Sequence, residues 1–166
     1  METREFRKIL VAVDASENAM RAISYAGDIV GSTSGFHIKL LYVERLPERD
    51  LFPDENTWKD ACKKQENQVR EFLENGRKTL LDKGVAQSSI SDEYVVHCRS
   101  PFYDPPPDCS LGHSIAQNIL KAAERGGFGT VVVGRRGVSK AEEFLFGSVS
   151  TKIIHSARNC TVWVVE

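Results

Sequence analysis

The sequence predicts a doubly wound α/β fold, in which helices cover both faces of a parallel sheet. The chain has 166 residues, about the size of one domain, so residues 1–166 are expected to form a single domain. Two segments, residues 8–13 and 130–135, are continuously apolar rather than alternating, which is typical of strands buried on both faces. Helical patterns lie between the strand-like segments, and this alternation implies right-handed crossovers and a parallel sheet.

The first half of the chain contains two predicted strands and two predicted helices. The strands are "KILVAV" (8–13) and "FHIKLLYVE" (36–44). Between them, Ser16 can cap a helix that Gly31 and Gly35 close, because glycine is favoured after a helix end. The apolar stripe of this helix consists of Ala19, Ala22, Ile23, Ala26 and Ile29. The second helix, residues 55–82, is long and highly charged, and its stripe consists of Val69, Phe72, Leu73, Leu80 and Leu81.

The second half adds three strands and two helices. The strands are "DEYVVHC" (92–98), "TVVVGR" (130–135) and "CTVWVVE" (160–166), which brings the predicted sheet to five strands. The helices are expected over residues 114–125 and from about Ser148 to Asn159. Two connections, residues 45–56 and 99–113, are longer than is usual and leave carboxyl ends of strands. They are either solvated loops or, for one of them, the cover of a site.

Composition excludes several classes of partner. The 22 basic and 23 acidic side chains give a formal charge of −1, so no overall field attracts nucleic acid or an acidic membrane, and any anion site must be local. No apolar run approaches the roughly 20 residues that cross a bilayer, and the N-terminal residues do not resemble a signal peptide. The four cysteines are too sparse for a disulfide scaffold. We therefore expect a soluble protein of the reducing cytoplasm.

The stretch "GRRGVSKAEEFLFGSVS" (134–150) combines three glycines, two arginines and several hydroxyl groups between a strand and a helix. Glycines let a ligand approach the main chain, and the free amides at a helix start favour phosphate. The side chains that can add charge or hydroxyl donors are Arg135, Arg136, Ser148, Ser150 and Thr151. A simpler interpretation remains open, in which the glycines shape a turn, Ser148 caps the helix and the arginines are solvated.

The spacing Gly134, two residues, Gly137, nine residues, Gly147 and Ser148 matches the G-x2-G-x9-G-S/T signature of ATP-binding members of the universal stress protein family. The similarity includes "KILVAVDASENAMRAISYA", "LLYVE" and "GSVSTKIIHSARNCTVWVV", which leaves out the two long connections and the first few residues. The sequence thus resembles this family over most of its length. The resemblance implies the strand order 3-2-1-4-5, with an adenine nucleotide across the carboxyl edge between the first and fourth strands.

The resemblance also implies which residues contact the nucleotide. Ala12, Val13 and Asp14 would line the adenine and ribose pocket, and Val43 would meet the base through its backbone. The residues expected around the ribose and phosphates are Val133, Gly134, Gly137, Gly147, Ser148, Val149 and Ser150, and Arg136 is added to them for its positive charge. Asp14 would accept a ribose hydroxyl or stand near a phosphate-bound metal; alternatively, it helps to start the following helix. The expected cofactor is ATP, with Mg or Mn bound through the phosphates.

Catalytic motifs are not evident in the sequence. The G-x4-G-K-S/T loop of efficient phosphate-hydrolysing sites is missing, and so is a G-x-S-x-G elbow. No catalytic residue is assigned, and any ATP hydrolysis is expected to be slow. Three functions remain open: an ATP-binding stress-response or regulatory module, an interaction protein of the same fold whose site is empty or holds another ligand, and a slow ATP hydrolase or nucleotidyl transferase.

Two further expectations concern metal and assembly. His97, Cys98, Cys109 and His113 are potential zinc ligands, but they lack paired C-x2-C spacing, and strand neighbours point to opposite faces. We therefore expect no metal site there. The last strand is expected at a sheet edge, where its apolar side chains would invite aggregation unless they are paired. Together with the family resemblance, this predicts a homodimer with Val162, Trp163 and Val164 at or near the contact.

Overall fold

The computed structural model describes residues 5–111, 114–135 and 147–166. The strands are β1 (Glu5–Val13), β2 (His37–Val43), β3 (Ile90–Val95), β4 (Phe128–Gly134) and β5 (Thr161–Val165). The helices are α1 (Glu17–Val30), α2 (Glu55–Asp82), α3 (Ile115–Arg125) and α4 (Ser148–Ser156). All strand pairs are parallel, and the sheet order is β3-β2-β1-β4-β5. The predicted fold class and strand order are confirmed.

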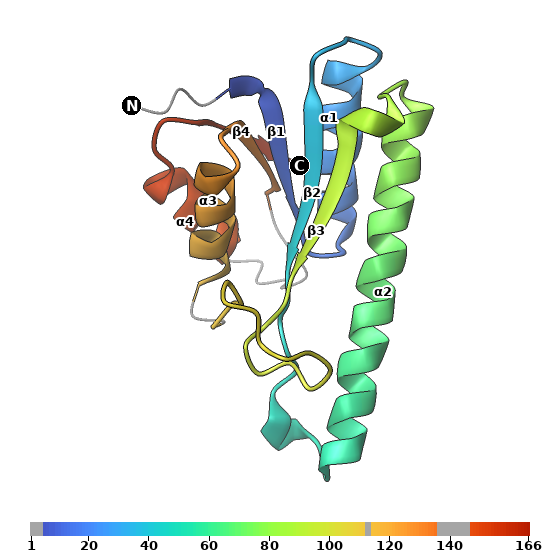
Figure 1. The fold of residues 1–166 in the computed structure, drawn as a ribbon, viewed down its shortest axis with the longest axis vertical. Helices are drawn as coiled ribbons and strands as arrows, with labels where there is room; N and C mark the ends of the chain where they lie inside the picture. The colour runs from blue at the N-terminus through green and yellow to red at the C-terminus, as the bar shows by residue number, and fades with distance from the viewer. Residues whose placement is uncertain (1–4, 112–113, 136–146) are drawn as a thin grey trace.

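Two apolar cores lie on opposite faces of the sheet because successive side chains of each strand alternate between them. In β1, Ile9, Val11 and Val13 belong to the core beneath α1 and α2. Leu10 and Ala12 belong to the core beneath α3 and α4. Figure 1 shows the two helix pairs on either side of the sheet. The central strand is therefore buried on both faces, as its unbroken apolar run predicts.

Local signals set the helix boundaries. The Ser16 hydroxyl accepts a hydrogen bond from the Ala19 amide at 3.1 Å, and Gly31 follows the last turn of α1 with φ of 50°. The bounds of α2 agree with the predicted residues 55–82. At α4 the N-cap is Gly147, so the interpretation in which Ser148 caps this helix is wrong. Ser148 is instead the first helical residue.

The third strand ends earlier than its sequence suggests. It was expected to extend to Cys98, but β3 ends at Val95. Beyond it, the Val96 carbonyl accepts a hydrogen bond from the Ser110 amide, and the Cys98 amide donates to the Ser110 carbonyl, both at 2.8 Å. The chain leaves the sheet here because it pairs with the far end of its own loop.

Candidate functional site

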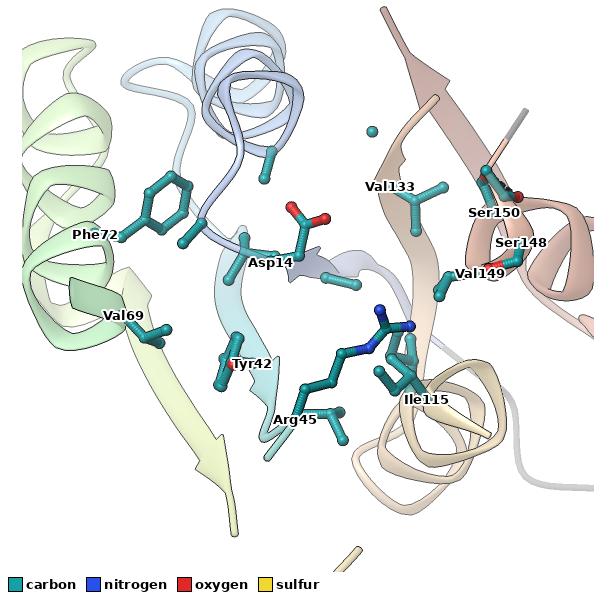
Figure 2. Close-up of a pocket in the computed structure, with 18 of the residues that line it drawn as sticks. Asp14, Tyr42, Arg45, Val69, Phe72, Ile115, Val133, Ser148, Val149 and Ser150 are labelled. Atoms are coloured by element: carbon teal, nitrogen blue, oxygen red, sulfur yellow. Dashed lines mark hydrogen bonds between the residues drawn. The ribbon is translucent and has the colours of Figure 1, made fainter. Parts of the chain in front are cut away.

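A cavity of about 1170 Å³, here called the edge cavity, opens at the carboxyl ends of β1, β2 and β4. This is the point where the chain's crossovers pass to opposite faces of the sheet, the usual ligand position in open α/β folds. In Figure 2, Val69, Phe72 and Tyr42 form one side and Val133, Val149 and Ser148 the other, with Asp14 and Arg45 between them. The cavity therefore has an apolar wall from α2 and a more polar wall from α4.

Most of the residues that the sequence singled out meet in this cavity. Ten of the twelve line it: Ala12, Val13, Asp14, Val43, Val133, Gly134, Gly147, Ser148, Val149 and Ser150. The other two, Arg136 and Gly137, lie outside the described residues. Residues from distant parts of the sequence thus converge because parallel strands bring their carboxyl ends to one edge.

At the end of β1, the backbone turns sharply beside the cavity. Ala15 adopts a φ of 61°, in the left-handed region that costs a residue with a Cβ about 1 kcal/mol or more. Asp14 Oδ1 accepts a hydrogen bond from the Ser16 amide at 3.2 Å. The helix-starting role considered for Asp14 is therefore present, and the same carboxylate also lines the cavity. One role does not exclude the other, because a carboxylate has two oxygens with several acceptor positions.

The α4 wall presents backbone amides at the start of a helix. The Gly147 amide donates to the Arg135 carbonyl at 2.8 Å, which holds the described ends of the glycine-rich connection together. Ser150 is 3% exposed, and its hydroxyl lies 2.9 Å from the carbonyl oxygens of both Arg135 and Gly147. The Ser150 proton is therefore donated within the protein, which leaves Ser148 and Thr151 as the hydroxyl donors of α4 beside the cavity.

Gly134 has a packing reason for being glycine. A Cβ at this position would lie 3.0 Å from the Asn18 Cβ and 3.1 Å from the Asn18 carbonyl carbon. The start of α1 therefore approaches the end of β4 closely. This glycine was expected either to admit a ligand or to shape a turn, and the close approach of two segments of the protein is a further reason that disfavours a side chain here.

The sequence did not predict that α2 forms one wall of the cavity. Val69 and Phe72 were predicted only as an apolar helix stripe, and both line the cavity. Tyr42 lies beside them, and Gln65 Nε2 donates to its hydroxyl at 3.2 Å. Burial raises the pKa of Tyr42, so its hydroxyl stays protonated. Nothing in the helical period separates a residue that faces the core from one that faces a cavity beside it.

Two basic side chains of the site were also not predicted from the sequence. Arg45 follows β2, and Lys152 is the fifth residue of α4; both line the edge cavity. Arg45 was part of a connection interpreted either as solvated or as covering a site. Only the three-dimensional structure distinguishes these two interpretations, because a single arginine after a strand belongs to no periodic pattern in the sequence.

The proline-rich connection does not line the cavity in its described part, residues 99–111. It covers two buried carboxylates instead. Glu44, which is 5% exposed, accepts hydrogen bonds from the Tyr94 hydroxyl (3.1 Å), the His97 amide (2.7 Å) and the Ser100 hydroxyl (3.2 Å).

The second carboxylate, Glu66, is 2% exposed and accepts hydrogen bonds from Lys63 (2.9 Å), Arg70 (2.9 Å) and Tyr103. Burial alone would raise the pKa of Glu66, but hydrogen bonds from Tyr103, Lys63 and Arg70 lower it to about 2. Arg70 also donates to the Tyr103 hydroxyl at 2.9 Å and lies over the Tyr94 ring. We call this group the carboxylate cluster: Glu44, Glu66, Arg70, Tyr94, Ser100 and Tyr103.

Cys98 and Cys109 form a disulfide that closes this connection, with their Cα atoms 5.0 Å apart. This pair was not expected from the sequence, because the four sparse cysteines indicated a reducing compartment. His97 and Cys98 are not strand neighbours that face opposite sides of the sheet, because β3 has already ended at Val95. His113 lies outside the described residues. No helix within the described residues has the length and apolar character to cross a membrane.

Comparisons with known proteins agree with this architecture. The family model described as "Universal stress protein family" matches residues 110–166. Universal stress protein YxiE of Bacillus subtilis (strain 168) is 27% identical over 175 residues, which cover 97% of this chain and 99% of that protein. The structure of hypothetical protein MJ0577 has a TM-score of 0.71 and 26% identity, and the match covers 96% of this chain and 95% of that one.

Two structures that share the fold are described as complexes. A universal stress protein in complex with cAMP has a TM-score of 0.63 and 19% identity, covering 96% of each chain. The universal stress protein from Archaeoglobus fulgidus in complex with dAMP has a TM-score of 0.62 and 17% identity, covering 96% of this chain and 97% of that one. In its glycine spacing, its matched C-terminal segment, its full-length relative and its fold, this chain is similar to the universal stress protein family.

Proposed function

We propose that the chain binds an adenine nucleotide, ATP, in the edge cavity and acts as an ATP-binding stress-response or regulatory module. The observation that carries the proposal is the convergence of ten residues, chosen by their positions in the sequence, on one cavity at the switch point of the sheet. The complexes of two fold relatives with cAMP and dAMP support adenine nucleotides as the ligand class.

The two walls suit different parts of a nucleotide. The apolar wall, with Val69 and Phe72, suits the flat and weakly polar base. Asp14 at the end of β1 suits the ribose hydroxyls, which donate hydrogen bonds to a carboxylate. The amides at the start of α4, together with Ser148, suit the phosphates, because the positive end of a helix dipole attracts an anion. Mg or Mn bound to the phosphates would neutralise part of their charge.

The first test is direct. Nucleotide released by acid from the native purified protein should be ATP, and calorimetric titration of ATP into nucleotide-free protein should show saturable heat. Adenosine should bind more weakly, because it lacks the phosphates that the α4 wall would hold. If wild-type protein shows neither bound nucleotide nor heat on titration, the interaction-protein hypothesis takes the place of this proposal.

The second test uses the glycine-rich connection. Gly137→Val adds a branched side chain where the family signature implies close approach of phosphate to the backbone. We expect ATP binding to be lost while the thermal unfolding temperature stays within a few degrees of wild type. ATP binding by Gly137→Val as tight as that of wild type would overturn the phosphate cradle. Steady-state turnover of ATP tests the remaining enzyme hypothesis, for which we expect slow hydrolysis at most.

The homodimer through β5 is part of the same proposal. β5 lies at an edge of the sheet, and Val162, Trp163 and Val164 are only partly buried. Trp163 packs against Tyr25 with ring centroids 5.9 Å apart, and Val162 and Val164 pack against the core beneath α3 and α4, so each of the three offers only its exposed part to an intermolecular contact. Sedimentation at micromolar concentration should show a dimer, and a single species near 18.5 kDa would contradict it. A cytoplasmic location stays a prediction, which cell fractionation tests.

A further inference from the structure

The edge cavity continues into a smaller recess between the end of β2 and the N-termini of α3 and α4. The recess has a volume of about 210 Å³. Its lining residues are Arg45, Ser114, Ile115, Ala116, Ser148, Val149 and Lys152. Five of these seven also line the edge cavity, so the two spaces are continuous. We call this space the cationic recess, because Arg45 and Lys152 line it.

Charge is distributed unevenly over the two spaces. The edge cavity is lined by two acidic residues, Asp14 and Glu71, and by two basic ones, Arg45 and Lys152. Both basic residues also line the recess, whereas neither acidic residue does. The first turns of α3 and α4 add the partial positive charge of two helix N-termini. The combined space is therefore acidic toward β1 and α2 and basic toward the recess.

No carboxylate of the described residues neutralises the two cations. Within residues 5–111, 114–135 and 147–166, neither Arg45 nor Lys152 forms a salt bridge, whereas many other basic side chains do. Figure 2 shows the Arg45 guanidinium directed into the cavity, toward Ile115 and away from Phe72. An arginine held over open space beside a second cation is a suitable partner for an oxyanion, because its planar donors bind phosphate oxygens in pairs.

This arrangement imposes a direction on a charged ligand. A phosphate placed beside Asp14 would be repelled, and one placed in the recess would be attracted by Arg45, Lys152 and the helix amides. A nucleoside monophosphate with its phosphate at the start of α4 does not need the recess. A longer phosphate chain that passes the start of α4 would enter it, since Ser148 and Val149 border both spaces.

We propose that the cationic recess is a subsite for the terminal phosphate groups of a nucleoside polyphosphate, and that Arg45 and Lys152 make the chain prefer ATP to AMP. This inference rests on the proposed nucleotide function and adds to it the residues that select among nucleotides. It assigns Arg45 the larger role, because its guanidinium makes paired hydrogen bonds, and Lys152 the smaller one, because its ammonium acts as a point charge.

Calorimetric titrations of ATP, ADP, AMP and adenosine into the full chain test the inference. Wild type should bind ATP at least about tenfold more tightly than AMP. Arg45→Gln should weaken ATP about tenfold and Lys152→Gln about threefold, with AMP and adenosine changed by less than about twofold, as charge-assisted contacts to the terminal phosphates predict. Lys121→Gln, an exposed charge removal on α3 outside the recess, is the matched control and should leave all four affinities unchanged.

Each other outcome has a distinct meaning. Equal weakening of ATP and AMP by Arg45→Gln would place Arg45 at the part that the two ligands share and would overturn the inference. So would unchanged ATP binding in both variants, or wild-type binding of AMP as tight as that of ATP. In all three cases the nucleotide site itself stands. If wild type binds none of the four ligands, the proposed function fails and this inference fails with it.

Two control measurements test whether the variants are folded and whether the recess binds phosphate without the base. Unfolding temperatures of Arg45→Gln and Lys152→Gln should match wild type, since both side chains are exposed and neither forms a salt bridge with another described residue. Inorganic tripolyphosphate should compete with ATP in wild type and less well in Arg45→Gln, because the recess would bind phosphate without the base. Equal competition in both proteins would contradict the role of Arg45.

Discussion

The edge cavity and the carboxylate cluster are neighbours at the carboxyl end of the sheet, and both are rich in polar groups, yet they are built in opposite ways. In the cluster, Glu44 and Glu66 each accept hydrogen bonds from three groups of the protein. In the cavity, the start of α4, Arg45 and Asp14 border about 1170 Å³ of open space. The type of polar side chain therefore does not show whether a region binds a ligand or stabilises the fold. What distinguishes the two regions is whether most of their polar groups form hydrogen bonds within the protein or border open space.

The two regions share one short segment of chain. Val43 lines the cavity, Glu44 is the centre of the cluster, and Arg45 lines the cavity again. Alternation along an extended chain sends these neighbours to different sides. Changes in the cluster should therefore alter the free energy of unfolding and leave nucleotide affinity intact, while changes in the cavity should do the reverse.

The largest expected effect comes from removing the Glu66 carboxylate. Glu66→Met keeps most of the side-chain volume but removes the carboxylate that accepts hydrogen bonds from Arg70, Lys63 and Tyr103. The free energy of unfolding should fall by about 3 kcal/mol. This is the low end for a broken buried ion pair, because both cations are half exposed. Urea denaturation measures this cost. ATP affinity should not change, and a loss of affinity without a loss of stability would reverse the roles assigned to the two regions.

Removing the disulfide should have a slightly smaller effect on the free energy of unfolding. Replacing Cys98 and Cys109 together by serine frees a connection closed over a sequence separation of 11 residues. The free energy of unfolding should fall by about 2–3 kcal/mol, from the greater entropy of the unfolded chain. Cys160→Ser, which alters a free and partly exposed thiol, is the control and should change little. An unchanged urea midpoint in the double variant, with the disulfide demonstrated in wild type by thiol titration, would contradict this prediction.

Acid should weaken the cluster by a predictable amount. The pKa of Glu66 is about 2 in the folded chain and 4.5 ordinarily, so its contribution to stability is present above about pH 4.5 and is lost as the pH falls toward 2. Between pH 6 and pH 3 this one group should account for about 2 kcal/mol. The measurement is the difference in acid dependence between wild type and Glu66→Met. Parallel curves for the two proteins would show that Glu66 has an ordinary pKa.

The smallest effect is expected at Ser148, and it should appear only in binding. Ser148→Ala removes one hydroxyl beside the cavity, worth about 1 kcal/mol, or roughly fivefold in ATP affinity. Stability should be unchanged, because Gly147 rather than Ser148 caps α4. Ser150→Ala is the matched comparison: the Ser150 hydroxyl donates to backbone carbonyls, so this change should reduce stability more than affinity. Equal affinity losses in the two variants would show that the two hydroxyls act alike.

Much of the architecture was predictable because it depends on neighbours in sequence. The Ser16 cap and the apolar period of residues 55–82 predicted α1 and α2 with their bounds. The glycine spacing, through the family resemblance, predicted residues that meet at one cavity. Predictions failed where a partner distant in sequence intervenes: β3 stops at Val95 because residues beyond it pair with Ser110.

The sequence by itself determined the alternation of strands and helices and the residues that end the strands at one edge. Periodicity, caps and turns act over a few residues, and right-handed crossovers then restrict the topology. Only the tertiary structure decided that Phe72 borders a cavity, that Glu66 is buried beneath Tyr103, and that Arg45 stands unpaired by any described carboxylate beside Lys152. Burial, hydrogen-bond satisfaction and open space depend on which distant segments come together, and no local pattern of residues encodes that.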